Sequence, residues 1–151
     1  MRPAMVAAMT NASPLSHELP ALIAARSFAT WRAAGGEIEV LAANEAVRMA
    51  QAAPPILCHA PATARRLGVE HIDGYDVLEL FAFARPAEFT LPTIHGLART
   101  LALELPDDVE DAEILVAVAA ALLDDIGANN DERGDLISIA KALQRAGWLW
   151  G

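Results

Sequence analysis

Acidic side chains gather in two segments of this chain, and converging carboxylates are what metal-dependent cleavage of phosphodiesters requires. Two-metal nucleases hold a pair of divalent ions close together with several carboxylates. The candidate ligands are Asp73, Asp76, Glu79, Asp107, Asp108, Glu110 and Asp111. A structural role also suits them. Asp76 and Glu79 have the spacing of a helix capping box, and residues 107–111 are typical of a helix start, where negative charge faces the positive end of the dipole.

The stretch from Pro55 to Gly68 predicts a buried strand that runs directly into a helix. Ile56-Leu57-Cys58 is a short apolar run, as a central strand requires. Pro61 suits the first turn of the following helix, and Gly68 is a typical helix stop. His59 lies in the junction, where we expect a structural role such as capping the helix that begins near Pro61.

Several other kinds of site have no motif in this chain. There is no Walker A sequence, no G-x-G-x-x-G and no G-x-S-x-G nucleophile turn. The four histidines are scattered, and the single cysteine, Cys58, has no second ligand at metal-binding spacing. We therefore expect no cofactor, no metal ion and no catalytic residue.

Length, charge and cysteine content predict one soluble domain of the cytoplasm. The 151 residues are 54% hydrophobic, enough for a real core. A net charge of −9, with Arg65-Arg66 as the only adjacent basic pair, argues against tight binding of nucleic acid. A lone thiol suits a reducing compartment. No signal peptide is visible, and the longest apolar run, Ile114 to Leu123, is too short for a membrane span, so no membrane partner is expected.

Periodicity and turn signals predict the order of the elements. Residues 1–18 are expected to form a loose leader and residues 19–151 a single domain. The domain opens with a meander of three strands, which we place at 20–26, 28–33 and 37–41. The Gly35-Gly36 pair marks the turn between the second and third of them.

Helices are predicted from capping residues and apolar spacing. They are expected over 45–52 with Asn44 as cap, from Pro61 to Gly68, after Asp76 as far as Pro86, over 94–103 with Thr93 as cap, over 107–126, and through Leu136, Ile139, Ala140 and Leu143 to a break at Gly147. Residues 127–134 are expected to form a polar loop. The order βββ-α-β-α, followed by helices, predicts an α/β fold with a mixed sheet flanked by helices. This is the layout of the ribonuclease-H-like fold.

From about residue 55 to residue 126 the chain resembles the DnaQ-like (DEDD-type) 3′–5′ exonucleases. The second motif of that family is a strand, then His-Asn, then Phe-Asp within the following helix. His59 matches the His, whereas Ala60 stands in place of the Asn and Ala64 in place of the metal-binding Asp. The segment that begins at Asp76 resembles the next family segment, an Asp followed by a Leu-rich stretch.

The other two family motifs are also incomplete. Asp111-Ala112 matches the Asp-Ala of the third motif, but Pro106 stands where its His would be. The first motif, Asp-x-Glu, would fall in residues 21–25, which contain no acid. The resemblance thus implies that His59, Asp76 and Asp111 are relics of exonuclease motifs. One of the four metal carboxylates survives, and a single carboxylate cannot hold two Mg²⁺ ions.

A second resemblance covers residues 75–87, 91–93 and 96–98, together with the closing Ala146-Gly147-Trp148-Leu149-Trp150. These residues are similar to the N-terminal region of large bacterial ATP-dependent DNA helicases of the XPD/DinG-like superfamily, which can carry an exonuclease-like module ahead of the motor. The resemblance implies that the partner is a helicase motor or another protein. The acidic net charge implies that contact with nucleic acid is weak at most. Without a Walker motif these residues cannot hydrolyse ATP by that mechanism.

Three functional hypotheses follow from the sequence. The first is a non-catalytic exonuclease-like accessory domain of a DNA helicase, which docks on its partner or guides a strand weakly. The second is an active metal-dependent exonuclease with an altered site made by Asp76, Asp111 and a neighbour. The third is a free-standing protein-interaction domain.

Overall fold

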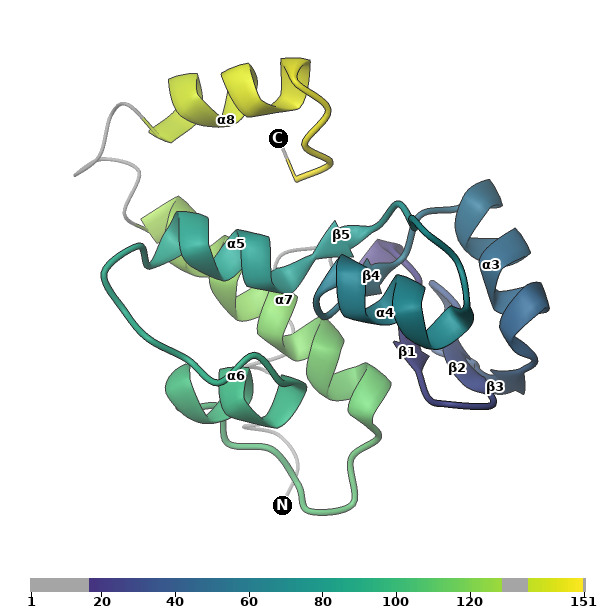
Figure 1. The fold of residues 1–151 in the computed structure, drawn as a ribbon. Helices are drawn as coiled ribbons and strands as arrows, with labels where there is room; N and C mark the ends of the chain where they lie inside the picture. Colours follow the sequence, from purple (N-terminus) through teal and green to yellow (C-terminus); the bar gives the residue numbers. More distant parts are fainter. Residues whose placement is uncertain (1–16, 129–135, 151) are drawn as a thin grey trace.

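The computed structural model describes residues 17–128 and 136–150, and in them five strands form one mixed sheet (Figure 1). Strands β1 (Ala21–Ala24), β2 (Ala29–Arg32) and β3 (Ile38–Leu41) form an antiparallel meander. The short strand β4 (Ile56–Leu57) pairs with β1 in parallel, and β5 (Tyr75–Asp76) pairs with β4 in parallel. The resulting strand order is β3-β2-β1-β4-β5.

Helices lie on both faces of this sheet (Figure 1). Helices α3 (Ala43–Ala52) and α4 (Ala60–Leu67) lie on one face, and α5 (Val77–Ala84), α6 (Ile94–Thr100) and α7 (Asp111–Ala128) on the other. Helix α8 (Leu136–Arg145) lies apart from the sheet, beyond α5 (Figure 1). None of the helices in the described residues is both long enough and apolar enough to cross a membrane. The expectation of an α/β fold with a mixed sheet flanked by helices is thus confirmed.

Alternation along β1 separates two hydrophobic cores. Ala21 is buried among residues of α5, α6 and α7, with Ile23 packed against the same cluster. Leu22 and Ala24 are buried on the opposite face, among residues of α3 and α4. Successive side chains of a strand point to opposite faces, so one four-residue strand can anchor both cores. The sheet is the middle layer of three.

Local signals predicted most element boundaries correctly. The three meander strands lie within the expected ranges, and α4 ends at Gly68, whose φ of 76° is left-handed. Asp76 caps α5, and Thr93 caps α6 through a bond from the N–H of Gly96 to its hydroxyl oxygen. The last helix is present, and Gly147 follows it with a φ of 101°.

Several boundaries differ from the expectation. Helix α6 ends at Thr100 rather than 103, and β4 ends at Leu57 rather than Cys58. The predicted cap Asn44 is wrong, because α3 begins at Ala43 and its N-cap is Ala42, which makes no side-chain bond. Helix α7 begins at Asp111 rather than 107, because the N–H of Val109 turns back to the carbonyl of Pro106. Gly127 and Ala128 lie inside α7 instead of opening a loop. The rest of that loop, and residues 1–16 of the expected leader, fall outside the described residues.

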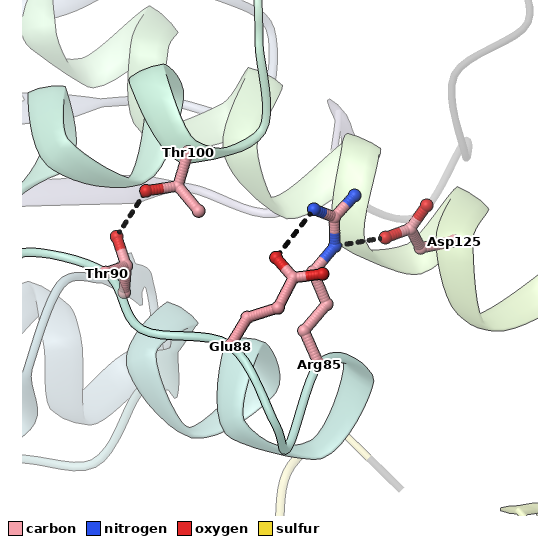
Figure 2. Close-up of polar contacts among 5 residues, drawn as sticks. All are labelled: Arg85, Glu88, Thr90, Thr100 and Asp125. Carbon is pink, nitrogen blue, oxygen red and sulfur yellow. Dashed lines mark hydrogen bonds and ion pairs between the residues drawn. The ribbon is translucent and has the colours of Figure 1, made fainter.

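Polar contacts fasten the segment after α5 to the helices around it (Figure 2). The Arg85 Nε donates to Asp125 Oδ2 of α7 at 2.7 Å, and Arg85 Nη1 donates to Glu88 Oε2 at 3.1 Å. The hydrogen bond from Arg85 to Asp125 raises the pKa of the guanidinium further above its usual value. The hydroxyl of Thr100 in α6 donates to that of Thr90 at 3.0 Å. These bonds join α5, α6 and α7 outside the apolar core.

Replacing Arg85 with alanine is expected to lower the free energy of unfolding by about 0.5–1 kcal/mol, because partly exposed ion pairs contribute little. Both partners keep access to water, with Arg85 and Asp125 side chains 26% and 32% exposed. Urea denaturation of Arg85→Ala and of the matched Arg99→Ala, which removes an exposed arginine of α6, would measure the difference. Equal stability of the two variants would contradict a stabilising role for the Arg85 contacts.

Candidate functional site at the β4–α4 and β5–α5 junctions

Three strands end at the same edge of the sheet. Strands β1, β4 and β5 are mutually parallel, so their carboxyl ends face one side, where α/β proteins commonly place their sites. Cys58 and His59 follow β4 at this edge, and Asp76 is the last residue of β5. Two of the three motif relics predicted from the sequence are therefore brought together, since the backbone N–H of His59 lies 3.3 Å from the Asp76 carboxylate.

The Asp76 carboxylate is buried and surrounded by backbone donors. Asp76 is only 2% exposed. Oδ2 accepts from the N–H of Ala60 at 2.7 Å, and Oδ1 accepts from the N–H of Leu78 at 2.9 Å. Two longer bonds reach Oδ1 from the N–H groups of His59 at 3.3 Å and Glu79 at 3.4 Å. One carboxylate thus binds donors at the starts of both α4 and α5.

Unsatisfied N–H groups at helix starts explain this arrangement. The first turn of a helix has no internal acceptors and carries partial positive charge, which a carboxylate neutralises. His59 adopts a positive φ of 62°, a region that few residues other than glycine occupy. We attribute this conformation to the turn that directs the N–H groups of His59 and Ala60 at Asp76. The hydroxyl of Thr63 closes the same turn, 3.1 Å from the carbonyl oxygen of His59.

The expected capping role of the His59 side chain is wrong. His59 is the N-cap residue of α4 by position, but its side chain makes no capping bond. Asp76, which lies seventeen residues further along the chain, supplies the acceptor instead. The Glu79 side chain bonds to the indole Nε1–H of Trp148 at 3.2 Å.

Cys58 lies beside this carboxylate and is held in its thiol form. Burial raises the pKa of Cys58 to about 11, and the negative charge of Asp76 adds to the rise, while Arg66 opposes it. A thiol with so high a pKa is a poor nucleophile and a poor metal ligand near neutral pH, because the thiolate is the reactive form. Cys58 therefore behaves as a small apolar side chain.

The pH dependence of Cys58 alkylation tests this assignment. The native protein should react with iodoacetamide at a rate that climbs only as the pH approaches about 11. Because the folded pKa exceeds the unfolded one, the unfolded chain loses its proton first, and stability should fall as the pH rises from about 9 towards 11. Alkylation of urea-unfolded protein is the control, and a native midpoint near that of the unfolded chain would contradict the assignment.

The third relic, Asp111, occupies a separate setting. It is the first residue of α7, and its Oδ1 lies 3.1 Å from His95 Nε2 with both side chains more than half exposed. No hydrogen bond or ion pair within residues 17–128 and 136–150 joins Asp111 to His59 or Asp76. An open groove of about 450 Å³ adjoins Asp111, lined by residues at the end of β1, the start of β2 and the 107–112 segment. The groove is acidic on one side and apolar on the other.

The donor set does not fit a two-metal site. Residues 21–25, on and after β1, contain no acid. Both oxygens of Asp76 accept from backbone N–H groups. The strands therefore supply no free carboxylate that could share a metal ion with Asp111. Within the described parts of the chain, no group of three or more His, Cys, Asp or Glu side chains could hold a metal ion. We derive no metal-dependent step from this arrangement.

Sequence reasoning missed the closing tryptophans as part of this site. The indole Nε1–H of Trp150 donates to the carbonyl oxygen of Asp76 at 2.9 Å, and its ring meets Tyr75 edge-on with centroids 5.1 Å apart. Trp148 stacks at a tilt on Phe83 of α5, also at 5.1 Å. The sequence offered one signal, which is that two tryptophans follow the glycine that ends the last helix. Such residues are commonly buried, and a buried indole N–H commonly finds an acceptor.

Comparisons with protein-family models, with curated proteins and with solved structures find no significant match to this chain. Its function is therefore inferred from its own sequence and from the contacts of its residues.

Proposed function

We propose that this chain is a non-catalytic, exonuclease-like domain of the ribonuclease-H-like fold, which acts by docking on a partner protein. The partner that its sequence favours is the motor of a DNA helicase, since residues 75–87, 91–93, 96–98 and 146–150 resemble the module ahead of such motors. Support for the fold comes from the strand order: a meander of three strands continues into two parallel strands, each followed by a helix.

One observation carries the non-catalytic part of the proposal: the candidate carboxylates do not converge. Asp76 is buried against four backbone N–H groups, and Asp111 is exposed beside His95. A nuclease with an altered site would need both of them free to share ions. Asp76 instead has the contacts of a structural residue that positions two helices.

Charge supports weak contact with nucleic acid. The chain carries a net charge of −9, and a phosphate backbone binds where Lys and Arg gather. In the adjacent pair Arg65-Arg66, Arg66 Nη1 already donates to the carbonyl of Ala24 at 3.3 Å. A protein surface is therefore the better partner.

A nuclease assay tests the non-catalytic part. End-labelled single-stranded DNA is incubated with the wild-type protein and with Asp111→Ala, in Mg²⁺ and in Mn²⁺. We expect both proteins to leave the label intact. Degradation by the wild type that disappears in Asp111→Ala would establish the altered-nuclease hypothesis in place of ours.

The helicase part has its own test. Purified domain is mixed with an XPD/DinG-like motor that lacks an N-terminal module, and the two are separated by size-exclusion chromatography. Co-elution supports the proposal. Separate elution, combined with an inert nuclease assay, would favour a free-standing interaction domain.

A further inference from the structure

Strand β3 is the last strand at one end of the sheet (Figure 1), and it carries exposed apolar side chains. Its side chains alternate, and Leu41 is buried, but Ile38 is 38% exposed and Val40 is 68% exposed. Within the described residues, helix α7 packs on β1, β2 and β4, and Ile38 and Val40 stay exposed on the outer part of the same face. An exposed apolar edge strand is a site where a further strand can pair.

The backbone of β3 is prepared for such pairing. The N–H of Ala33 donates to the carbonyl of Glu37 at 2.8 Å, so these two residues form a hydrogen-bonded pair. In an antiparallel ladder every second pair is hydrogen-bonded, and the next such pairs are Trp31 with Glu39 and Ala29 with Leu41. Glu37, Glu39 and Leu41 therefore direct their backbone groups at β2. Ile38 and Val40 direct theirs away from the sheet, on the same residues that expose apolar side chains.

An acidic groove lies on the same face of the sheet. Phe28 and Thr30 line it and share the face with Val40, which pairs with Thr30 across the ladder. Phe28 is 46% exposed, and the opposite wall carries four carboxylates, those of Asp107, Asp108, Glu110 and Asp111. The surface formed by β3 and this groove is thus apolar in the middle and acidic at its side.

Charge decides between the possible occupants. A second copy of this chain would bring Glu37 and Glu39 of its own β3 against the same residues, and opposed like charges destabilise strand pairs. A segment rich in Lys or Arg would instead meet Glu37 and Glu39, and it would be attracted by the carboxylates of the groove. Opposite charge also speeds association and excludes wrong partners.

We propose that β3 accepts an extended, basic and apolar segment of the partner protein as an additional strand. Main-chain bonds to Ile38 and Val40 provide the pairing, and apolar side chains on one face of the segment cover Ile38 and Val40. Basic side chains on its other face meet Glu37 and Glu39, and the acids of the groove attract the segment through their field. This inference rests on the proposed docking function and identifies the docking surface and the chemistry of the docking segment.

The probe is a short fluorescent peptide of alternating lysine and valine, with fluorescence anisotropy as the readout. Its controls are a glutamate–valine peptide and a lysine–valine peptide in which every backbone nitrogen is methylated, so that it has no N–H group to donate to a strand on either edge. We expect the unmodified basic peptide to bind at least about tenfold more tightly than either control, a difference of about 1.4 kcal/mol. Amide hydrogen exchange at Ile38 and Val40 should slow when it binds.

Variants locate the surface. Val40→Lys should weaken binding about tenfold or more, whereas Phe89→Lys, at an exposed side chain of the α5–α6 connection, should leave it unchanged. Equal binding of the methylated peptide, or insensitivity to Val40→Lys, would overturn the inference. So would a dimer of the free chain that Val40→Lys dissolves, because β3 would then pair with itself. DNA degradation by the same preparation would defeat the proposed function, whereas failure of binding without degradation defeats only this inference.

Discussion

Replacing Asp76 with alanine is expected to lower the free energy of unfolding by roughly 3–5 kcal/mol. Removal of the carboxylate leaves four backbone N–H groups at the starts of α4 and α5 without their acceptor. Bonds to charged groups contribute about 1.5–3 kcal/mol each, and buried donors left unpaired cost about 1–3 kcal/mol. Only the bonds to Ala60 and Leu78 are short, so we count two at full strength. Urea denaturation measures the loss.

Asp76→Asn sharpens this prediction because it changes one atom of the side chain. The two oxygens of Asp76 accept from different helices, Oδ1 from Leu78 of α5 and Oδ2 from Ala60 of α4. An amide places its NH₂ group against one of these N–H donors, whichever way it is turned. The Asp76→Asn variant should therefore retain one cap and lose the other, with a stability between wild type and Asp76→Ala.

Asp73→Asn is the matched control. Asp73 lies three residues earlier, its side chain is 73% exposed, and its contact is to the equally exposed His71. Its replacement should change the free energy of unfolding by less than about 0.5 kcal/mol. If Asp76→Asn were as stable as Asp73→Asn, the two-helix cap would not be a major source of stability.

Replacing Trp150 with alanine is expected to cost about 3–5 kcal/mol, as for other large side chains removed from a core. Trp150 is only 9% exposed, lies in the core that contains Val77 and Leu80, and bonds to the carbonyl of Asp76. The substitution opens a cavity beside Tyr75 and removes that bond. Thermal or urea unfolding followed by circular dichroism would measure the effect.

Two further variants separate the contributions of the ring and of its N–H. Trp150→Phe keeps an aromatic ring but removes the donor to Asp76, so it should cost less, about 1–2 kcal/mol. Trp148→Ala removes an indole from the same segment that is only half-buried, and its cost should be smaller than that of Trp150→Ala. A greater loss in Trp148→Ala than in Trp150→Ala would show that Trp150 is not the anchor of the segment.

The parts of the fold that sequence predicted are those with local causes. The meander follows from the alternation of apolar and polar residues, and the helix stop at Gly68 follows from the left-handed conformation that glycine adopts easily. The caps Asp76 and Thr93 accept from N–H groups that lie two or three residues further along the chain. Strand β5 was not predicted, because two residues are too few to show a period and pairing with β4 defines it. Asn44 failed as a cap because α3 had already begun one residue earlier.

The contacts of the site depend on residues far apart in the sequence. That Asp76 would cap α5 could be predicted, but its bonds to His59 and Ala60 require β4 and β5 to be neighbours. The bond from Trp150 to Asp76 joins residues that are 74 positions apart. The spacing of the acids could not show that Asp76 and Asp111 lie in separate settings, because charge clusters carry no information on burial.

A titration with Mn²⁺ followed by amide NMR spectra tests most directly whether the β4–α4 junction is architecture and not a metal site. Manganese broadens the signals of nuclei close to it. We predict that the amide signals of His59, Ala60 and Leu78, which surround the Asp76 carboxylate, keep their widths throughout the titration. Saturable broadening centred jointly on these amides and on the amide of Asp111 would show that the two carboxylates share bound metal, and it would contradict the account.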